Sequence, residues 1–181
     1  MVPLDKKQAR AKGLANRKAL DPTVRHAYSH TIFMQVKTML DQAKHVGCYV
    51  SMKEEVETDE ILGYCFAHDI PVSVPKVEGN DLVFYRIQSL NDVEQGYFGV
   101  KEPIVDTRTD PKDIDLMIIP LSSFDEEGHR TGYGRGFYDR YLTDSMHKVG
   151  IAYSCQRMEY IETDAWDTPL DEVMTEKTED H

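Results

Sequence analysis

The chain has 181 residues, of which 40% are hydrophobic, and its formal net charge is −11. This length suits one domain with its own core, and the negative charge argues against nucleic acid or an anionic membrane as a partner. No apolar run reaches the roughly 20 residues that a membrane span needs, and the charged N-terminus does not resemble a secretory signal. The three widely separated cysteines predict a reduced, cytoplasmic protein with buried thiols.

The N-terminal part of the chain predicts two helices. Residues 3–20 form the first, because a proline near the first turn and Asp5 close behind suit a helix start. Lys6, Arg10 and Arg17 follow at spacings of four and seven, which places them on one face. A solvated basic stripe is the simpler interpretation of that face from the pattern alone. After Asp21-Pro22-Thr23, apolar residues with a period near 3.6 predict the second helix.

The rest of the chain alternates short apolar segments with helical ones. Two further helices are expected at 59–68 and 138–146, whereas 91–113 and 121–129 lack a regular pattern. Strands are expected at 45–52, 71–77, 81–87, 115–120 and 148–153, and near 173–174. This alternation predicts a single α/β domain over 1–181 with a largely parallel sheet. Residues 176–181 are expected to form a frayed acidic tail.

A glycine-rich segment, Arg130-Thr-Gly-Tyr-Gly-Arg-Gly-Phe-Tyr-Asp-Arg-Tyr-Leu142, carries the strongest chemical signal. Alternating glycines let a backbone turn tightly and present N–H groups to phosphate oxygens. Arg130 and Arg135 add forked cationic donors, and Asp139 is suited to a magnesium ion that bridges phosphates. The spacing Gly-x-Gly-x-Gly matches neither the Walker loop nor the dinucleotide fingerprint. An ordinary glycine-rich connection, with Asp139 as a first-turn helix acid, therefore remains an alternative interpretation.

Several segments together resemble the 5-formyltetrahydrofolate cyclo-ligase family, also called 5,10-methenyltetrahydrofolate synthetases. The likeness covers nearly the whole chain in the expected order. Two departures occur: Leu121-Ser122-Ser123 stands where the family commonly has a glycine-bearing turn, and Phe137 replaces a usual tyrosine, which removes one hydroxyl. The matching segments are Lys6-x-x-x-Arg10, Ser51–Thr58, Glu102-Pro103, Asp113–Leu116, Pro120–Asp125, Gly128–Arg130, Gly132–Leu142 and Leu170–Val173.

The resemblance implies an ATP- and Mg²⁺-dependent ring closure of 5-formyltetrahydrofolate to 5,10-methenyltetrahydrofolate, with release of ADP and phosphate. It implies catalytic roles for Arg130, Arg135 and Tyr138. It also implies a three-layer αβα sandwich with a mostly parallel sheet, like that of sugar-phosphate isomerases and coenzyme A transferases. The implied ligand contacts are Lys6, Arg10, Arg130, Thr131, Gly132, Tyr133, Gly134, Arg135, Gly136, Phe137 and Tyr138 for ATP, Met52, Glu57 and Tyr133 for the folate, and Asp139 and Asp171 for the metal.

The expected partner is the formyl-folate, with or without a polyglutamate tail, and the chain is expected to act as a monomer without nucleic acid or membrane. Two alternatives stay open. The kinship with sugar-phosphate isomerases allows a phosphosugar enzyme that needs no nucleotide or magnesium. A non-catalytic folate or nucleotide sensor would instead bind both ligands and release no ADP.

Overall fold

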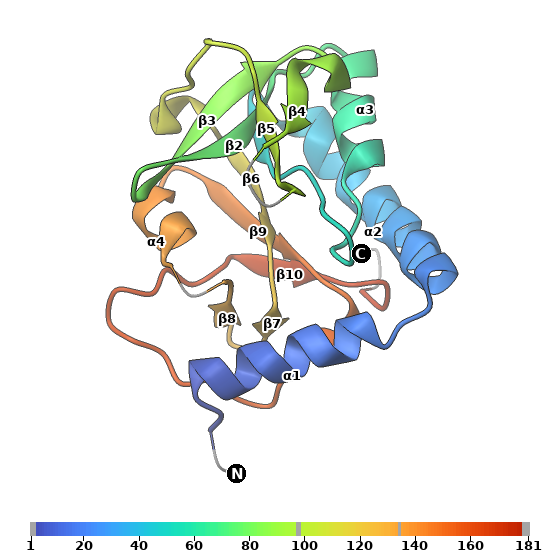
Figure 1. The fold of residues 1–181 in the computed structure, drawn as a ribbon, viewed down its shortest axis with the longest axis vertical. Helices are drawn as coiled ribbons and strands as arrows, with labels where there is room; N and C mark the ends of the chain where they lie inside the picture. The colour runs from blue at the N-terminus through green and yellow to red at the C-terminus, as the bar shows by residue number, and fades with distance from the viewer. Residues whose placement is uncertain (1–2, 97–98, 134, 179–181) are drawn as a thin grey trace.

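The computed structural model describes residues 3–96, 99–133 and 135–178, and its centre is a six-stranded mixed sheet (Figure 1). The strand order is β10-β9-β6-β1-β2-β3. All neighbours pair in parallel except β2 and β3, which form an antiparallel hairpin at the sheet edge. The strands are β1 (Val46–Cys48), β2 (Val72–Glu78), β3 (Asp81–Ile87), β6 (Leu116–Pro120), β9 (His147–Ile151) and β10 (Glu172–Met174). The predicted α/β class with a mostly parallel sheet is confirmed.

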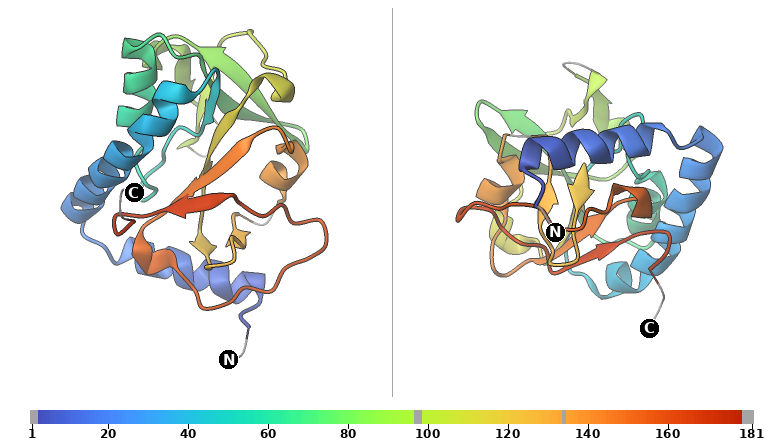
Figure 2. Two further views of the ribbon diagram at one scale, coloured as in Figure 1. Left: turned by 180° about the vertical axis from the view of Figure 1, so that it is seen from behind. Right: turned by 90° about the horizontal axis from the view of Figure 1, so that it is seen from below.

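Among the described residues, the α-helices that lie around this sheet (Figures 1 and 2) are α1 (Lys6–Lys18), α2 (Pro22–Gln42), α3 (Asp59–Ala67) and α4 (Phe137–Tyr141). Both faces of the sheet are covered by other parts of the chain. Strand β6 shows this, because all five of its residues are buried. Leu116 and Ile118 join the cluster that also holds residues of α2 and α3, whereas Met117 and Ile119 join a second cluster bordered by α4. This alternation is the period-two pattern of a strand with two buried faces.

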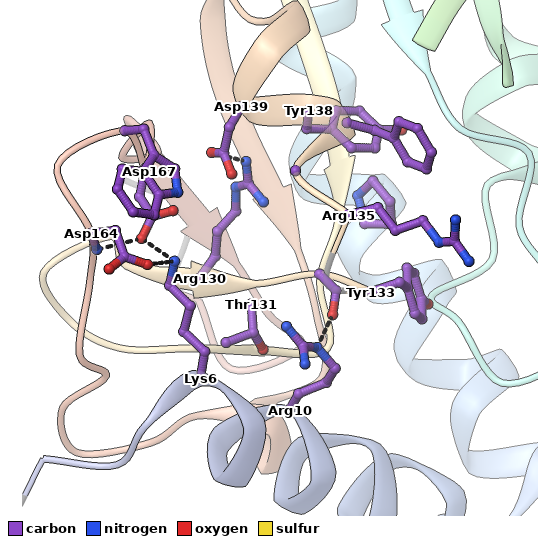
Figure 3. A pocket seen from close by; sticks show the side chains of 15 residues that line it. Lys6, Arg10, Arg130, Thr131, Tyr133, Arg135, Tyr138, Asp139, Asp164 and Asp167 are labelled. Carbon is purple, nitrogen blue, oxygen red and sulfur yellow. Dashed lines mark hydrogen bonds and ion pairs between the residues drawn. The ribbon is translucent and has the colours of Figure 1, made fainter. Parts of the chain in front are cut away.

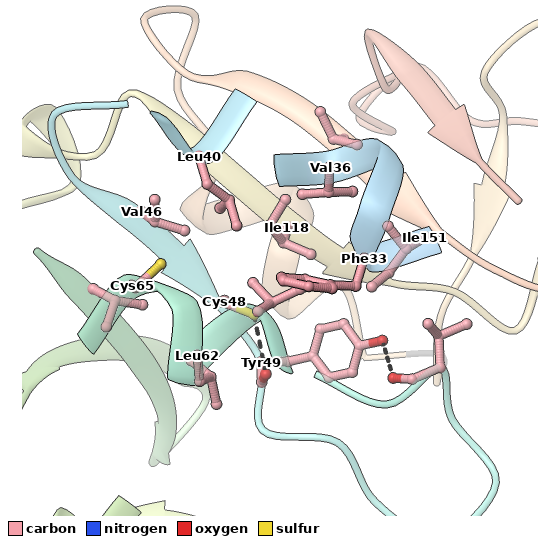
Figure 4. Close-up of a cluster of buried hydrophobic side chains, with 14 of the residues drawn as sticks. Phe33, Val36, Leu40, Val46, Cys48, Tyr49, Leu62, Cys65, Ile118 and Ile151 are labelled. Atoms are coloured by element: carbon pink, nitrogen blue, oxygen red, sulfur yellow. Dashed lines mark hydrogen bonds between the residues drawn. The ribbon is translucent and has the colours of Figure 1, made fainter. Parts of the chain in front are cut away.

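The larger cluster packs apolar side chains of α2 and α3 against β1, β6 and β9 (Figure 4). Val36, Leu40, Val46 and Ile118 are completely buried there. The three cysteines are free, and Cys48 and Cys65 lie in this cluster. Burial raises the pKa of the Cys65 thiol to about 12, so it stays protonated and behaves as a small apolar side chain.

Three expectations about regular structure were wrong in detail. Residues 91–113 contain a hairpin of β4 (Val93–Gln95) and β5 (Lys101–Pro103), whose polar and partly exposed residues carry little periodic signal. The loop 121–129 is partly a hairpin of β7 (Ser123–Phe124) and β8 (Arg130–Thr131). Helix α4 ends at Tyr141 rather than near 146, because Leu142 has an extended backbone with a ψ of 142°.

No helix of the described residues is both long and apolar enough to span a bilayer. At the C-terminal end, Glu176 accepts a hydrogen bond of 2.7 Å from the backbone N–H of Ser154 and another from its hydroxyl. The predicted acidic tail is thus anchored at Glu176, and residues 179–181 lie outside the described part of the chain.

Helix α1 crosses the β7–β8 hairpin at very close range (Figure 1). It begins at an Asp5 cap, whose side chain accepts a hydrogen bond from the N–H of Gln8 at 2.7 Å. Gly13 is buried at the crossing, where an added Cβ would lie 1.9 Å from the carbonyl oxygen of Ser122. The close approach of helix and hairpin therefore depends on the missing side chain.

A pair of glycine substitutions tests this packing. Alanine is favoured over glycine inside a helix by roughly 1 kcal/mol. Gly13→Ala should nevertheless lower the free energy of unfolding, because the new methyl group meets backbone that cannot rotate away. Gly63→Ala in α3 is the matched control, since its Cβ would meet nothing within 4 Å, and it should raise stability. Urea denaturation of both variants measures the two signs, and equal stabilisation by both would contradict the crossing.

Candidate functional site

A cavity of about 350 Å³ opens where helix α1, the glycine-rich segment and the loop before β10 meet (Figure 3). Most of the residues predicted for the phosphate site lie around it, although they come from both ends of the chain. Gly134 lies outside the described residues. The lining residues are Lys6, Arg10, Pro120, Arg130, Thr131, Gly132, Tyr133, Arg135, Gly136, Phe137, Tyr138, Asp139, Asp164, Trp166 and Asp167.

The β7–β8 hairpin fixes the start of the glycine-rich segment. The Ser122 hydroxyl is buried and donates to the carbonyl of Gly132 at 2.9 Å, and the Ser122 N–H donates to the carbonyl of Thr131 at 2.9 Å. Arg10 Nε on helix α1 donates to the same Gly132 carbonyl at 2.8 Å. The departure at residues 121–123 thus supplies a hydroxyl that holds the loop, and Arg10 connects the loop to α1.

Helix α4 follows the segment directly. Its N-terminal cap is Gly136, whose φ of 66° lies in the left-handed region that glycine adopts without strain. Phe137 lines the cavity, and the Arg140 guanidinium carbon lies 5.5 Å from the centre of its ring. Tyr138 packs edge-on against Phe84 of β3, and burial raises the pKa of its hydroxyl well above the usual range. The Tyr138 hydroxyl therefore stays protonated at neutral pH.

Arg130 and Asp139 form a largely buried ion pair at the inner wall of the cavity. Arg130 Nη2 lies 2.8 Å from Asp139 Oδ1, and the two side chains are 7% and 18% exposed. The backbone N–H of Thr168 donates to the same Asp139 oxygen at 3.0 Å. Within the described structure, the buried Nε of Arg130 has no hydrogen-bond partner. The guanidinium thus carries one buried donor without a partner beside its ion pair with Asp139.

Lys6 is paired with two carboxylates from the opposite end of the chain. Its Nζ lies 2.7 Å from Asp164 Oδ2 and 2.5 Å from Asp167 Oδ2 (Figure 3). Partial burial lowers the pKa of Lys6, but the hydrogen bonds to Asp164 and then Asp167 outweigh it, so the pKa is raised overall. Sequence reasoning missed both aspartates, because they stand in an irregular acidic loop with no spacing that points to α1. Trp166, the one tryptophan of the chain, lines the cavity and is 73% exposed.

The residues predicted for the folate lie on a neighbouring surface. Met52 is 39% exposed, and Glu57 Oε1 lies 2.7 Å from His26 Nδ1; neither is among the residues that line the cavity. Tyr133 does line it, and its hydroxyl donates to Glu55 Oε2 at 3.0 Å, three residues beyond Met52. Tyr133 is therefore the predicted folate contact that borders both places.

The two predicted metal ligands are not brought together. Asp139 lines the cavity, whereas Asp171 lines a separate hollow with Glu126 and Arg157. Asp171 Oδ2 accepts a hydrogen bond from the N–H of Lys148 at 2.8 Å, and the N–H of Asp171 donates to the carbonyl of Lys148 at 2.9 Å. This exchange anchors the start of β10 beside β9 in the structure. The carboxylates that share the cavity with Asp139 are Asp164 and Asp167.

Comparison with known proteins bears on this arrangement. Residues 3–176 match the model of the 5-formyltetrahydrofolate cyclo-ligase family. The 5-formyltetrahydrofolate cyclo-ligase of Haemophilus influenzae is 32% identical over 142 residues, which cover 74% of this chain and 76% of that protein.

Two solved structures are similar to the whole chain. The solution structure of Aquifex aeolicus 5,10-methenyltetrahydrofolate synthetase has a TM-score of 0.84 and 35% identity, and the match covers 96% of this chain and 90% of the other. The Mycoplasma pneumoniae 5,10-methenyltetrahydrofolate synthetase has a TM-score of 0.79 and 27% identity, with coverages of 96% and 100%. The fold thus agrees over nearly the full length of the chain. The chain belongs to the 5-formyltetrahydrofolate cyclo-ligase family, whose members use ATP, and its activity is the formation of 5,10-methenyltetrahydrofolate from 5-formyltetrahydrofolate.

Proposed function

We propose that the chain closes the folate ring by transferring the γ-phosphoryl group of ATP to the formyl oxygen. A formamide oxygen is a poor leaving group. Once phosphorylated, it leaves as phosphate when the nitrogen at the 10-position of the folate attacks the formyl carbon, and ADP is the other product. The observation that supports this route is the cavity itself, where basic side chains from α1 and the glycine-rich segment converge. Phosphoryl transfer mainly requires such positioning and charge neutralisation.

The triphosphate is proposed to bind along the glycine-rich segment. Backbone N–H groups around Gly132 and Gly136 contact the phosphates, together with Thr131, Phe137 and the predicted Gly134. Lys6, Arg10, Arg130 and Arg135 offset the charge that moves in the transition state. Because Lys6 is held by two aspartates, phosphate oxygens replace carboxylate oxygens at its ammonium group. The Arg130 guanidinium keeps its place beside Asp139 and offers its remaining donors.

The carboxylate side chains of the cavity are chemically suited to a magnesium ion. The described residues contain no cluster of three or more acidic, histidine or cysteine side chains arranged to hold a metal, but Mg²⁺ is commonly held by one or two carboxylates together with substrate phosphates. Asp139 would hold the ion, with Asp164 or Asp167 near it; Asp171 stays a prediction that the geometry does not favour. When bound, the ion would neutralise charge on the phosphates.

The folate is proposed to lie on the side of Met52 and Glu57. The Glu57 carboxylate suits the donor-rich edge of the pterin, and Tyr133 and Tyr138 line the meeting point of the two substrates. The three-layer αβα fold shared with sugar-phosphate isomerases and coenzyme A transferases also belongs to the proposal. The proposal further includes a single domain over residues 1–181, a monomeric state and a cytoplasmic location. The proposed substrates are formyl-folates with or without polyglutamate tails.

A product assay tests the reaction and separates it from the alternatives. Purified protein is mixed with 5-formyltetrahydrofolate and MgCl₂, with and without ATP, and the absorbance of the methenyl product is followed. Product that requires ATP, with one ADP per turnover, supports the proposal. A phosphosugar enzyme would show no dependence on nucleotide. A sensor would bind both ligands, seen as a change in Trp166 emission, and release no ADP.

Arg130→Ala should lower turnover by more than tenfold, which corresponds to about 1.4 kcal/mol of transition-state stabilisation. The side chain is nearly buried and faces the cavity, so its charge acts in a medium where screening is weak. Steady-state rates at saturating substrates measure the effect. Arg157→Ala is the control, because this arginine is half exposed and pairs with Glu126 away from the cavity. Wild-type turnover in a folded Arg130→Ala variant would remove Arg130 from the phosphate site.

Asp139→Asn should raise the magnesium concentration needed for half-maximal rate about tenfold. The amide oxygen still accepts from Arg130 and Thr168, so the loss of charge is the main change. The titration is followed both as rate and as Trp166 emission in the presence of ATP. Asp144→Asn, at an exposed position, controls for a loss of surface charge. The same titration of Asp171→Asn decides whether Asp171 contributes to magnesium binding. An unaltered magnesium titration of Asp139→Asn would show that Asp139 has only a structural role.

A further inference from the structure

Glu55 is a buried carboxylate of the described structure that the proposed reaction does not use. Glu55 is 8% exposed and stands between the predicted folate contacts Met52 and Glu57. Burial raises the pKa of its carboxyl group, although hydrogen bonds from Met52 and Tyr133 and the charge of Arg17 act in the opposite direction. An acidic group taken out of water costs several kcal/mol unless its oxygens are satisfied. The hydrogen-bond partners of the Glu55 carboxylate therefore indicate what this side chain does in the structure.

The two oxygens of Glu55 bind different parts of the molecule. Oε1 accepts from the backbone N–H of Met52 at 2.8 Å, within the same loop. Oε2 accepts from the hydroxyl of Tyr133 at 3.0 Å, on the glycine-rich segment 78 residues away. Arg17, buried on helix α1, adds favourable charge near both groups. Three segments thus converge on the Glu55 carboxylate. They are helix α1, the loop Ser51–Thr58 that carries the predicted folate contacts (the folate-side loop), and the glycine-rich segment.

The folate-side loop does not need Tyr133 to hold its shape. Thr58 and Ser51 exchange two side-chain to backbone hydrogen bonds, of 3.0 and 3.1 Å, across its base. The Tyr49 hydroxyl donates to the carbonyl of Val56 at 2.7 Å, and the Ser29 hydroxyl accepts from the N–H of Glu57 at 2.9 Å. The contact between Glu55 and Tyr133 is therefore an addition to a loop that is already fixed.

Tyr133 also differs from the other aromatic residues of the cavity in how it is held. Its side chain points away from Lys6 and Asp167 (Figure 3). Although the residue as a whole is 55% exposed, its hydroxyl end enters the protein. Burial, followed by the charge of Glu55, raises the pKa of that hydroxyl to about 12, so it stays a hydrogen-bond donor at neutral pH. The exposed part of the ring faces the space where the two substrates are proposed to meet.

We propose that Glu55 is a positioning residue for the cyclisation: it fixes Tyr133, and through it the phosphate-binding segment, against the loop that carries the folate contacts. The inference rests on the proposed function. A small displacement of one reacting group from the other strongly reduces the rate of transfer. Because the link touches neither Lys6 nor Arg130, its loss should lower kcat while the KM for ATP changes little.

A double-mutant cycle tests this role. Tyr133→Phe removes the donated hydrogen bond and keeps the ring, and Glu55→Gln keeps the shape and removes the charge that strengthens the bond. Each is expected to lower kcat about tenfold, with the KM for ATP within about twofold of wild type. The double variant should be no slower than either single variant, because both changes break the same link. Glu54→Gln, a half-buried neighbour of equal charge, is the matched control and should keep wild-type rates.

Other outcomes would overturn the inference. Multiplicative losses in the double variant would show that Glu55 acts independently of Tyr133. Wild-type kcat in a folded Tyr133→Phe variant would do the same, even if Glu55→Gln failed to fold. Equal thermal midpoints of Tyr133→Phe and wild type exclude general destabilisation. Wild-type protein without ATP-dependent product would refute the proposed function itself, which is a separate result read before the variants are compared.

Discussion

The close contact between helix α1 and the backbone of Ser122 is the constraint on which the site depends. A helix that carries Lys6 and Arg10 reaches the glycine-rich segment only because Gly13 lets it approach the β7–β8 hairpin without a side chain between them. The same hairpin holds the segment through the Ser122 hydroxyl. The apolar sheet supplies the platform, and the helix crossing sets the distance between cations and loop. The contact between Gly13 and the backbone of Ser122 therefore affects both the stability of the fold and the geometry of the site.

Charge is locally concentrated in a protein that is acidic overall. With a net charge of −11, isolated basic groups at the surface would be widely compensated, whereas the cavity collects Lys6, Arg10, Arg130 and Arg135 from two segments. Three aspartates accompany them and neutralise most of this charge while no anion is present. Such pairing preorganises Lys6 and Arg130, since both are already partly desolvated and directed before a phosphate arrives. A phosphate that binds at Lys6 must also displace aspartate oxygens from it, so anion binding depends on an exchange of ion-pair partners.

The sequence predicted the sheet, the first three helices and the basic residues around the cavity, but not the short hairpins, the end of α4 or the acidic partners. The central strands have buried faces on both sides, so their apolar runs were visible. The hairpin of β4 and β5 is polar and short, and helix α4 shares an apolar pattern with the extended residues that follow it. Asp164, Asp167 and Glu55 act through tertiary contacts with residues far away in the chain. No local spacing encodes such contacts, and the separation of Asp171 from Asp139 depends equally on the loop path.

The ends of the chain are joined where the cavity forms. Leu4 exchanges backbone hydrogen bonds of 3.0 and 2.9 Å with Tyr160 and Glu162, and the pairing of Lys6 with Asp164 spans 158 residues. Contacts of such long sequence separation form late, because a large loop must close first. During translation the first helix therefore leaves the ribosome long before its partner loop exists. Binding competence arises only after residues 160–168 have been synthesised, so translation products that stop before them would fold their sheet in part and lack a finished phosphate site.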